Sequence, residues 1–262
     1  MTNPSPYYIE FTPPNVFASL IDAFWCFSTP DAAIQSSDSI QYRVLPDGCM
    51  DLIFQYERSL NGGINNPQLT VYGSTDRFSL FDIKPVTEFV GIRFYPGMAG
   101  QFLNLNAIEV FQQEVKAQDC SEPFGKIFDQ LCECNSIIQA LGTLQTSLLE
   151  LQRVNSGDDI PLPTREALRL ISSSKGQMPV SQVAETIGVS ERTVRRGVTA
   201  AVGLSPKVLA RILRFQNTMS RLRSPAPSDL CSIALECGYA DQSHMAREFQ
   251  QLAGLTPTAF MP

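Results

Sequence analysis

Histidine is almost absent from this chain, and with it most of the sites that bind metals or activate nucleophiles. The 262 residues hold one histidine, His244, and seven cysteines without a C-x-x-C pair. Structural zinc sites take about four Cys or His ligands at short spacings, and a glycine-rich phosphate loop is missing too. The sequence therefore predicts no metal and no cofactor. We expect the cysteines to be reduced thiols without disulfides, with a redox-sensing thiol as the alternative: Cys26, Cys49, Cys120, Cys132, Cys134, Cys231 and Cys237.

Long apolar runs are missing as well. None approaches the roughly 18 residues that a membrane-spanning helix needs. The first six residues, MTNPSP, lack the basic patch and apolar stretch of a secretory signal. The composition, 44% hydrophobic and 18% charged, is typical of a globular chain with two domains. These features predict a cytoplasmic protein that does not enter a membrane.

Positive charge is scarce overall but unevenly placed. The formal net charge is −6. Residues 161–262 hold 12 Lys or Arg and 7 Asp or Glu, a net charge of +5, so residues 1–160 carry −11. Because nucleic acids are polyanions, only the second half has a charge that favours them.

A polar segment divides the chain. It reads VNSGDDIPLP from residue 154 and holds one Gly and two Pro, which is typical of an interdomain linker. We predict an α+β protein of two domains. A β-rich domain that ends in helices covers residues 1–153, a linker covers 154–162, and an all-α domain covers 163–262.

Each domain shows its own periodicity. Residues 1–105 favour strands, because short apolar runs alternate with turn signals such as the PDG at 46–48. Residues 107–153 favour helices, since leucines and isoleucines recur at helical spacings. In the second domain, Thr164 is the expected N-cap of a helix through about Ser173. Pairs of Ser-Pro and Thr-Pro predict two further helix starts, at Ser205-Pro206 and Thr256-Pro257.

The second domain contains a degenerate internal repeat. Its first copy, residues 183–196, reads VAETIGVSERTVRR, and its second copy, residues 233–247, reads IALECGYADQSHMAR. Each copy places a Gly four residues after an Ala, then an apolar residue, a capping residue and a helix with Arg. This spacing predicts a helix-turn-helix, because a small residue allows close helix crossing and Gly ends the first helix in a left-handed conformation. A helical interaction domain is the alternative.

The repeat is similar to the C-terminal domain of the AraC/XylS family of transcription regulators. The resemblance covers about residues 163–262 and rests on GYADQSHMAREF at 238–249 and GLTPTAF at 254–260, with GLSPK and RILRF after the first copy. It implies two helix-turn-helix units joined by a linker helix, which read two successive major-groove segments of DNA. The residues that the resemblance assigns to DNA are Arg192, Arg195, Arg196, Gln242, Ser243, His244 and Arg247.

Side-chain chemistry favours different roles within that set. Arg can bond bidentately to guanine and Gln to adenine. Arg196 and Arg247 occupy matching places in the two copies and can instead bind phosphate, and His244 can be structural. One departure stands out, since Gly197-Val198 replaces the large aromatic residue that Phe249 supplies in the second copy. We expect the first recognition helix to pack more loosely for that reason.

The first domain resembles the N-terminal domain of a subset of these regulators. The resemblance rests on LPDGCMDLIF at 45–54, VYG at 71–73 and RFYPGMAGQFL at 93–103. It implies a domain that senses a small-molecule effector, forms a homodimer, or both. The candidate ligand residues are Asp47, Cys49, Asp51 and Arg93, and the alternative is a plain turn followed by ordinary strand residues.

Together these features predict a sequence-specific DNA-binding transcription regulator that is not an enzyme. Its expected partners are double-stranded promoter DNA, RNA polymerase, a small-molecule effector and a second copy of itself. Two alternatives stand. One is an enzyme whose second domain only targets it to DNA, with Asp47 and Asp51 as paired carboxylates. The other is a DNA-binding subunit without a ligand.

Overall fold

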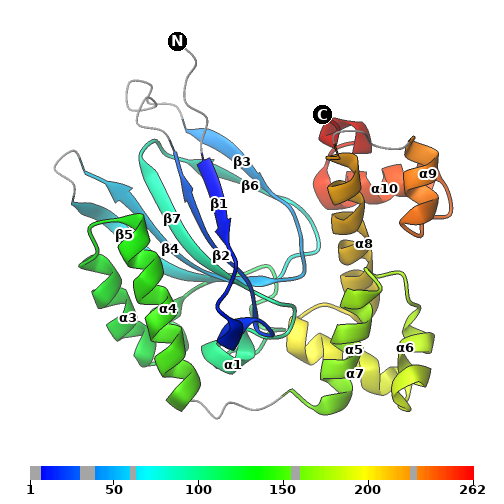
Figure 1. Ribbon diagram of the computed structural model, residues 1–262, viewed down its shortest axis with the longest axis horizontal. Coiled ribbons are helices and arrows are strands. Elements are labelled where there is room, and N and C mark those ends of the chain that lie inside the picture. Colours follow the sequence, from blue (N-terminus) through cyan, green and yellow to red (C-terminus); the bar gives the residue numbers. More distant parts are fainter. Residues whose placement is uncertain (1–6, 30–38, 60–62, 155–159, 225–228) are drawn as a thin grey trace. The chain divides into compact units, whose positions relative to one another are not determined.

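The chain divides into two compact units, which are described separately (Figure 1). The computed structural model describes residues 7–29, 39–59, 63–154, 160–224 and 229–262. The second unit comprises residues 160–262 together with two short segments, Val44–Gly48 and Ser74–Ser79, and the first unit holds the rest. Residues 155–159 of the expected linker lie outside the described residues, and the domain boundaries stay a prediction.

The first unit is built on a six-stranded sheet with the order β1-β2-β7-β4-β5-β8, and β3 and β6 form a separate pair. The ladders between neighbouring strands of the large sheet are antiparallel. This confirms the β-rich first domain. The strands are β1 Tyr7–Phe11, β2 Ile21–Ser28, β3 Ile40–Val44, β4 Met50–Arg58, β5 Ile64–Tyr72, β6 Ser79–Ile83, β7 Thr87–Phe94 and β8 Glu114–Lys116.

Alternation along the central strands gives the large sheet two different faces. In β4, Leu52, Phe54 and Tyr56 are buried, while the residues between them are half-buried. Phe54 meets Phe128 edge-to-face, so this face packs against helices. The short helix η1 Asn15–Phe17 lies between β1 and β2, and α1 Gly100–Leu103 lies between β7 and β8. The helices after β8 are α2 Ala117–Cys120, α3 Pro123–Cys132 and α4 Ile137–Val154. α3 and α4 run side by side in Figure 1.

The helical prediction for residues 107–153 is partly wrong, because β8 lies within that range. Val115 pairs with Val71 at the edge of the sheet. A three-residue strand is set by backbone hydrogen bonds to a distant partner, which local periodicity does not report.

The other face of the sheet carries an aromatic cluster. Trp25, Phe27 and Ile83 are buried there, with Ile53, Phe81 and Phe89 packed against them. The Trp25 indole lies directly on Gly91, where an added Cβ would come 2.2 Å from a ring atom. A glycine at this point of β7 therefore makes room for the only tryptophan of the chain.

The second unit is helical, as predicted. Its helices are α5 Leu162–Ser173, α6 Val180–Ile187, α7 Glu191–Val202, α8 Pro206–Leu222, α9 Leu230–Glu236, α10 Gln242–Ala253 and η3 Pro257–Phe260. α8 begins at the Ser205 cap and buries one stripe, namely Leu209, Ile212, Phe215, Met219 and Leu222. None of the helices in the described ranges is long and apolar enough to cross a membrane.

The expectation for Thr164 is wrong. α5 begins at Leu162, and Pro161 is its N-cap, so Thr164 lies inside the first turn and is buried. Its hydroxyl faces Gly197 of α7 rather than capping a helix end. A Thr before an apolar run is a capping signal only while the side chain stays free to reach the backbone.

Candidate nucleic-acid interface

Both copies of the repeat form the same turn. Gly188 and Gly238 adopt φ values of 70° and 80°, a left-handed conformation that glycine reaches most cheaply. In each copy a backbone N–H from the turn then donates to the small residue of the preceding helix. Val189 donates to Ala184 at 3.0 Å, and Tyr239 donates to Ala234 at 2.9 Å.

The capping residues also match. The Ser190 hydroxyl accepts a hydrogen bond from the N–H of Thr193, and the Asp241 carboxylate accepts one from the N–H of His244. Both caps satisfy the third N–H of a helix that would otherwise lack a partner. The caps therefore set a common register for α7 and α10, in which Arg196 corresponds to Arg247.

The inward faces of α7 and α10 are apolar. α7 buries Val194, Val198 and Val202, while α10 buries Met245 and Phe249. In the common register Val198 corresponds to Phe249. Every other side chain on the first two turns of these helices is exposed or half-buried.

The arginines of α7 and α10 lie on the exposed side. Arg195 bonds to Glu191 one turn earlier at 3.1 Å, with 67% of its side chain exposed. Arg192, Arg196 and Arg247 are exposed and have no ion-pair or hydrogen-bond partner within the part of the chain that the structure describes. Unpaired guanidinium groups on adjacent turns are a ready site for phosphate or base edges.

The first three residues of α10 differ in exposure and in internal contacts. Gln242 and Ser243 are exposed, whereas His244 is half-buried. The Nδ1 atom of His244 accepts the N–H of Ala240 at 3.3 Å, and its ring meets Tyr239 edge-to-face at 5.4 Å. His244 thus has a structural contact and an exposed part at once.

An ion-pair network that the sequence did not reveal ties α10 to the linker helix α8. The Nε atom of Arg211 donates to both carboxylate oxygens of Glu248, at 3.1 and 2.8 Å. Another nitrogen of Arg211 donates to Gln251 at 2.7 Å. The pair is 37 residues apart, so no local spacing could have shown it.

α7 has a different anchor. An added Cβ at Gly197 would lie 2.1 Å from the Thr164 hydroxyl, which means that α5 and α7 cross in close contact. Val198 is fully buried. The expectation of looser packing is therefore wrong, because the small Gly197 lets a helix approach where the second copy uses a large ring.

The turn of the second copy is covered by α8. The Arg214 guanidinium lies 5.2 Å from the centre of the Tyr239 ring and donates to the carbonyl of Gly238 at 3.3 Å. Burial raises the pKa of Tyr239 to about 12, against the nearby charge of Arg214, which lowers it. Tyr239 thus stays neutral in the core of the turn.

In the first unit, the structure brings two of the predicted ligand residues together. Asp51 and Arg93 are paired across β4 and β7, with Nε of Arg93 3.7 Å from Oδ1 of Asp51. The same carboxylate oxygen accepts the Trp25 indole N–H at 2.9 Å. Cys49 is buried in the first unit, whereas Asp47 is half-buried in a segment of the second unit.

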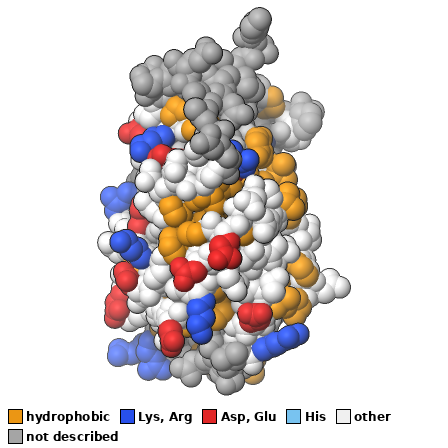
Figure 2. Space-filling model, turned by 90° about the vertical axis from the view of Figure 1, so that its left-hand side faces the viewer, with side chains coloured by type: hydrophobic (Ala, Val, Ile, Leu, Met, Phe, Trp, Pro, Cys, Tyr) orange, Lys and Arg blue, Asp and Glu red, His pale blue; other side chains and the backbone are white. Residues whose placement is uncertain are grey.

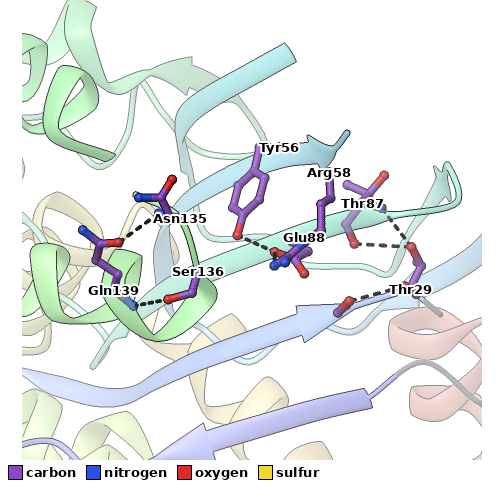
Figure 3. Close-up of polar contacts among 9 residues, drawn as sticks. Thr29, Tyr56, Arg58, Thr87, Glu88, Asn135, Ser136 and Gln139 are labelled. Atoms are coloured by element: carbon purple, nitrogen blue, oxygen red, sulfur yellow. Dashed lines mark hydrogen bonds and ion pairs between the residues drawn. The ribbon is translucent and has the colours of Figure 1, made fainter. Parts of the chain in front are cut away.

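The first unit contains a second polar cluster that the sequence did not predict. Tyr56 and Arg58 of β4 both bond to the buried carboxylate of Glu88 on β7 (Figure 3). Tyr56 is opposite Glu88 in the ladder, and Arg58 lies two residues further along β4, so the motif follows from register and not from spacing along the chain. Burial and the Glu88 charge also raise the pKa of the nearby Cys26 thiol.

The described residues contain no group of three or more His, Cys, Asp or Glu side chains placed to hold a metal ion. The seven cysteines, all within the described ranges, form no disulfide in the structure. Cys231 is exposed on α9, and its thiol donates to Oε1 of Gln242 at 3.3 Å. This contact was also not foreseen, because it joins the starts of two helices across the turn.

Comparison with known proteins gives two matches along the chain. Residues 9–116 match a "Domain of unknown function (DUF6597)", and residues 183–261 match a "Helix-turn-helix domain". A "Probable thc operon regulatory protein" of Rhodococcus erythropolis is 30% identical over 83 residues, which are 31% of this chain and 25% of that protein. The chain thus matches about a quarter of the length of this relative.

Solved structures with a similar arrangement include the C-terminal domain of AraT, a response regulator from Geobacillus stearothermophilus. It is 23% identical, with a TM-score of 0.37, over 39% of this chain and 86% of that one. ToxT from Vibrio cholerae is 13% identical, with a TM-score of 0.45, over 86% of this chain and 94% of that one.

Proposed function

Residues 183–261 form a helix-turn-helix domain of the AraC type, and from this premise we propose that the protein is a sequence-specific DNA-binding transcription regulator. The proposal rests above all on the shared register of α7 and α10. Two capped helices present exposed arginines at matching positions, and a basic second domain supplies the charge that a polyanion attracts.

We propose that α7 and α10 read two successive major-groove segments, which lie about one helical turn, roughly 34 Å, apart. Arg192, Arg195, Gln242, Ser243 and His244 are the base-reading candidates. The ion pair between Arg195 and Glu191 is exposed. Breaking it so that Arg195 can bind a base therefore costs little free energy.

Arg196 and Arg247 are assigned to phosphate. Both are the sixth residue of their helix, and both are exposed. Phosphate contacts orient a protein on duplex DNA, whereas contacts to base edges specify the sequence.

The proposal is tested by binding of the intact protein to duplex DNA at several salt concentrations. Affinity should fall with a slope of about −0.9 per phosphate contact in a double-logarithmic plot. Arg247→Ala should reduce that slope by about one unit and weaken all sequences alike. An affinity that does not change with salt concentration, or no binding at low salt, would contradict the proposal.

The division between the two helices is tested by selecting binding sites from random duplexes. Arg195→Ala should relax base preference in one half of the site and Gln242→Ala in the other, each by about 1–3 kcal/mol on the preferred sequence. If only Gln242→Ala changes the preference, the first helix-turn-helix contacts only the DNA backbone, and the base-reading role of Arg195 is wrong.

For the first unit we propose a sensing or dimerisation role that controls the DNA reader and, through it, RNA polymerase. Asp51 and Arg93 are the ligand residues that geometry supports best, because they share a ladder position beside Trp25. Cys49 and Asp47 stay candidates. A screen of small molecules by thermal shift, repeated with Arg93→Ala, tests this role.

Dimerisation is supported by the outer surface of the first unit. Figure 2 shows the side on which α3, α4 and β5 lie in Figure 1, and hydrophobic side chains gather in a band across its middle. Ile138 of α4 has 66% of its surface exposed. Exposed apolar patches are typical of interaction surfaces, so sedimentation of the intact protein should give a dimer, and Ile138→Lys should weaken it.

The competing proposal is an enzyme whose second domain serves only to bring it to DNA, and it predicts catalytic turnover. It requires the carboxylates of Asp47 and Asp51 to act on a substrate. The paired contacts of Asp51 with Trp25 and Arg93 favour a structural or binding role instead. A turnover screen of the intact protein, with Asp51→Asn as the inactive control, separates the two.

A further inference from the structure

We infer that the second recognition helix, α10, reads guanine, because the acceptor atoms of Gln242 and His244, two of its leading polar side chains, already take hydrogen bonds within the protein. The inference rests on the proposed function and narrows it, since it names the base that one helix selects. Two separate hydrogen bonds carry it, one at Gln242 and one at His244.

Gln242 is the first residue of α10 and is exposed. Its side chain has one acceptor atom, Oε1, with two lone pairs, and one donor group, Nε2. The Cys231 thiol of α9 donates to Oε1 at 3.3 Å and takes one of those lone pairs. The amide oxygen is thereby turned toward α9, which favours presentation of the NH2 group to DNA. A thiol is a weak donor, so the bias is real but small.

His244 is restricted in the same sense. Its Nδ1 accepts the N–H of Ala240 at 3.3 Å, and an imidazole nitrogen accepts only when it carries no proton. An imidazole whose Nδ1 accepts carries its proton on Nε2, which is a donor. The edge-to-face contact with Tyr239 keeps the ring in this orientation.

Of the other groups around this helix start, the exposed Ser243 hydroxyl can donate or accept, so it favours no base. Arg247 has donors alone. The carboxylate of Asp241 accepts the N–H of His244 at 2.6 Å. The surface that α10 offers through Gln242, His244 and Arg247 thus consists of hydrogen-bond donors.

Base edges in the major groove differ in how they meet such a surface. Guanine presents two acceptors, N7 and O6, while adenine and cytosine place an amino donor there and thymine offers one acceptor beside a methyl group. Donors that face an amino group leave both groups unsatisfied, which is costly in a closed interface. Guanine is the base that satisfies two donors at once.

The test is a binding-site selection with the intact protein on random duplexes. The positions that α10 reads are those whose preference is lost in Gln242→Ala or His244→Ala. We expect guanine at one or more of them. Replacing that guanine with 7-deazaguanine, which lacks the N7 acceptor, should weaken binding on the order of fivefold.

Cys231 provides the matched variants. Cys231→Ala frees Oε1 of Gln242, so the ratio of adenine to guanine at the position that Gln242 reads should rise about two- to fivefold. Cys231→Ser keeps a donor and should behave as the wild type, as should Cys120→Ala, which removes a thiol from the first unit. Because Cys231 is exposed, neither of its substitutions disturbs a core.

The outcomes separate this inference from the function it builds on. Adenine at the positions that depend on Gln242 and His244, or identical base preference in Cys231→Ala and the wild type, overturns the inference and leaves the regulator intact. If the intact protein shows no sequence preference on duplex DNA, the proposed function and the inference fall together.

Discussion

The two helix-turn-helix units carry the same sequence pattern but are anchored in different ways. In the second helix-turn-helix, Phe249 packs edge-to-face against Phe215 of the linker helix, with ring centres 4.7 Å apart, and Glu248 is bound by Arg211. In the first helix-turn-helix, Val198 and Gly197 stand at the same register positions, and Gly197 packs against Thr164 of α5.

The difference shows that one turn geometry can be supported by two kinds of contact. A large ring and an ion pair fill the space beside α10, whereas α7 removes the space by letting a helix come closer. The caps and glycines of the turns are equivalent in both units. The pattern that defines the motif is thus separable from the contacts that fix its stability.

The largest difference should appear when the matching core residues are truncated. Phe249→Ala should lower the free energy of unfolding by about 3–5 kcal/mol, because it opens a cavity between Phe215 and Phe260. Val198→Ala removes a smaller side chain and should cost about 2 kcal/mol. Urea unfolding followed by circular dichroism measures both.

Trp25 provides the control for this experiment. It is the only tryptophan and lies in the first unit. Its fluorescence should report the same transition in both variants as in the wild type. Equal losses of unfolding free energy in Phe249→Ala and Val198→Ala would contradict the proposed difference between the two anchors.

A methyl group added at Gly197 should destabilise the first helix-turn-helix by about 1–3 kcal/mol, since its Cβ would overlap the Thr164 hydroxyl. The double variant Gly197→Ala with Thr164→Ala should recover most of that loss. Gly142→Ala in α4 is the matched control, because no atom apart from the local helix backbone lies within 4 Å of the added Cβ there. That change should stabilise by up to about 1 kcal/mol through helix propensity.

The ion pairs of the two recognition helices should differ in strength. A double-mutant cycle on Arg211 and Glu248, whose side chains are 26% and 12% exposed, should give a coupling free energy of about 1–2 kcal/mol. The same cycle on Glu191 and Arg195, which are 46% and 67% exposed, should give about 0.3–0.5 kcal/mol. High salt should reduce the second value more than the first.

The smallest difference concerns the caps. Ser190→Ala and Asp241→Ala should each cost about 1 kcal/mol, because each leaves one N–H of its helix unsatisfied. Asp241 also places a negative charge at a helix N-terminus. Its loss should therefore matter less in high salt, while the loss of the neutral Ser190 should not change. Thermal unfolding at two salt concentrations compares them, and an equal response to salt would count against a charge effect.

Local spacing was sufficient to predict the turns of the second domain. The turns depend on backbone groups at most five residues away from the glycines and caps, namely Gly188, Gly238, Ser190 and Asp241. A motif of that length can be recognised in a sequence. The same is true of the buried stripe of α8, because helical periodicity is a local property. Recognition of the family then assigned a role to the exposed arginines.

Contacts between residues far apart in the chain could not be predicted from the sequence. Thr164 carried a capping signal, yet packing against Gly197 decided its place. Asp51 and Arg93 were selected from a resemblance, and only the pairing of β4 with β7 made them neighbours. Tyr56 and Glu88 gave no signal at all, since their contact depends on the same ladder register.

The amino-acid sequence by itself determined the division into an acidic β-rich half and a basic helical half, the position of both helix-turn-helix turns, and their caps. These follow from composition, from periodicity and from contacts within a few residues. Only the tertiary structure decided how the recognition helices are held, and which atoms of Gln242 and His244 are left free. The contacts at stake join residues from different elements, such as Arg211 to Glu248 and Cys231 to Gln242, and chain folding alone sets the distance between them.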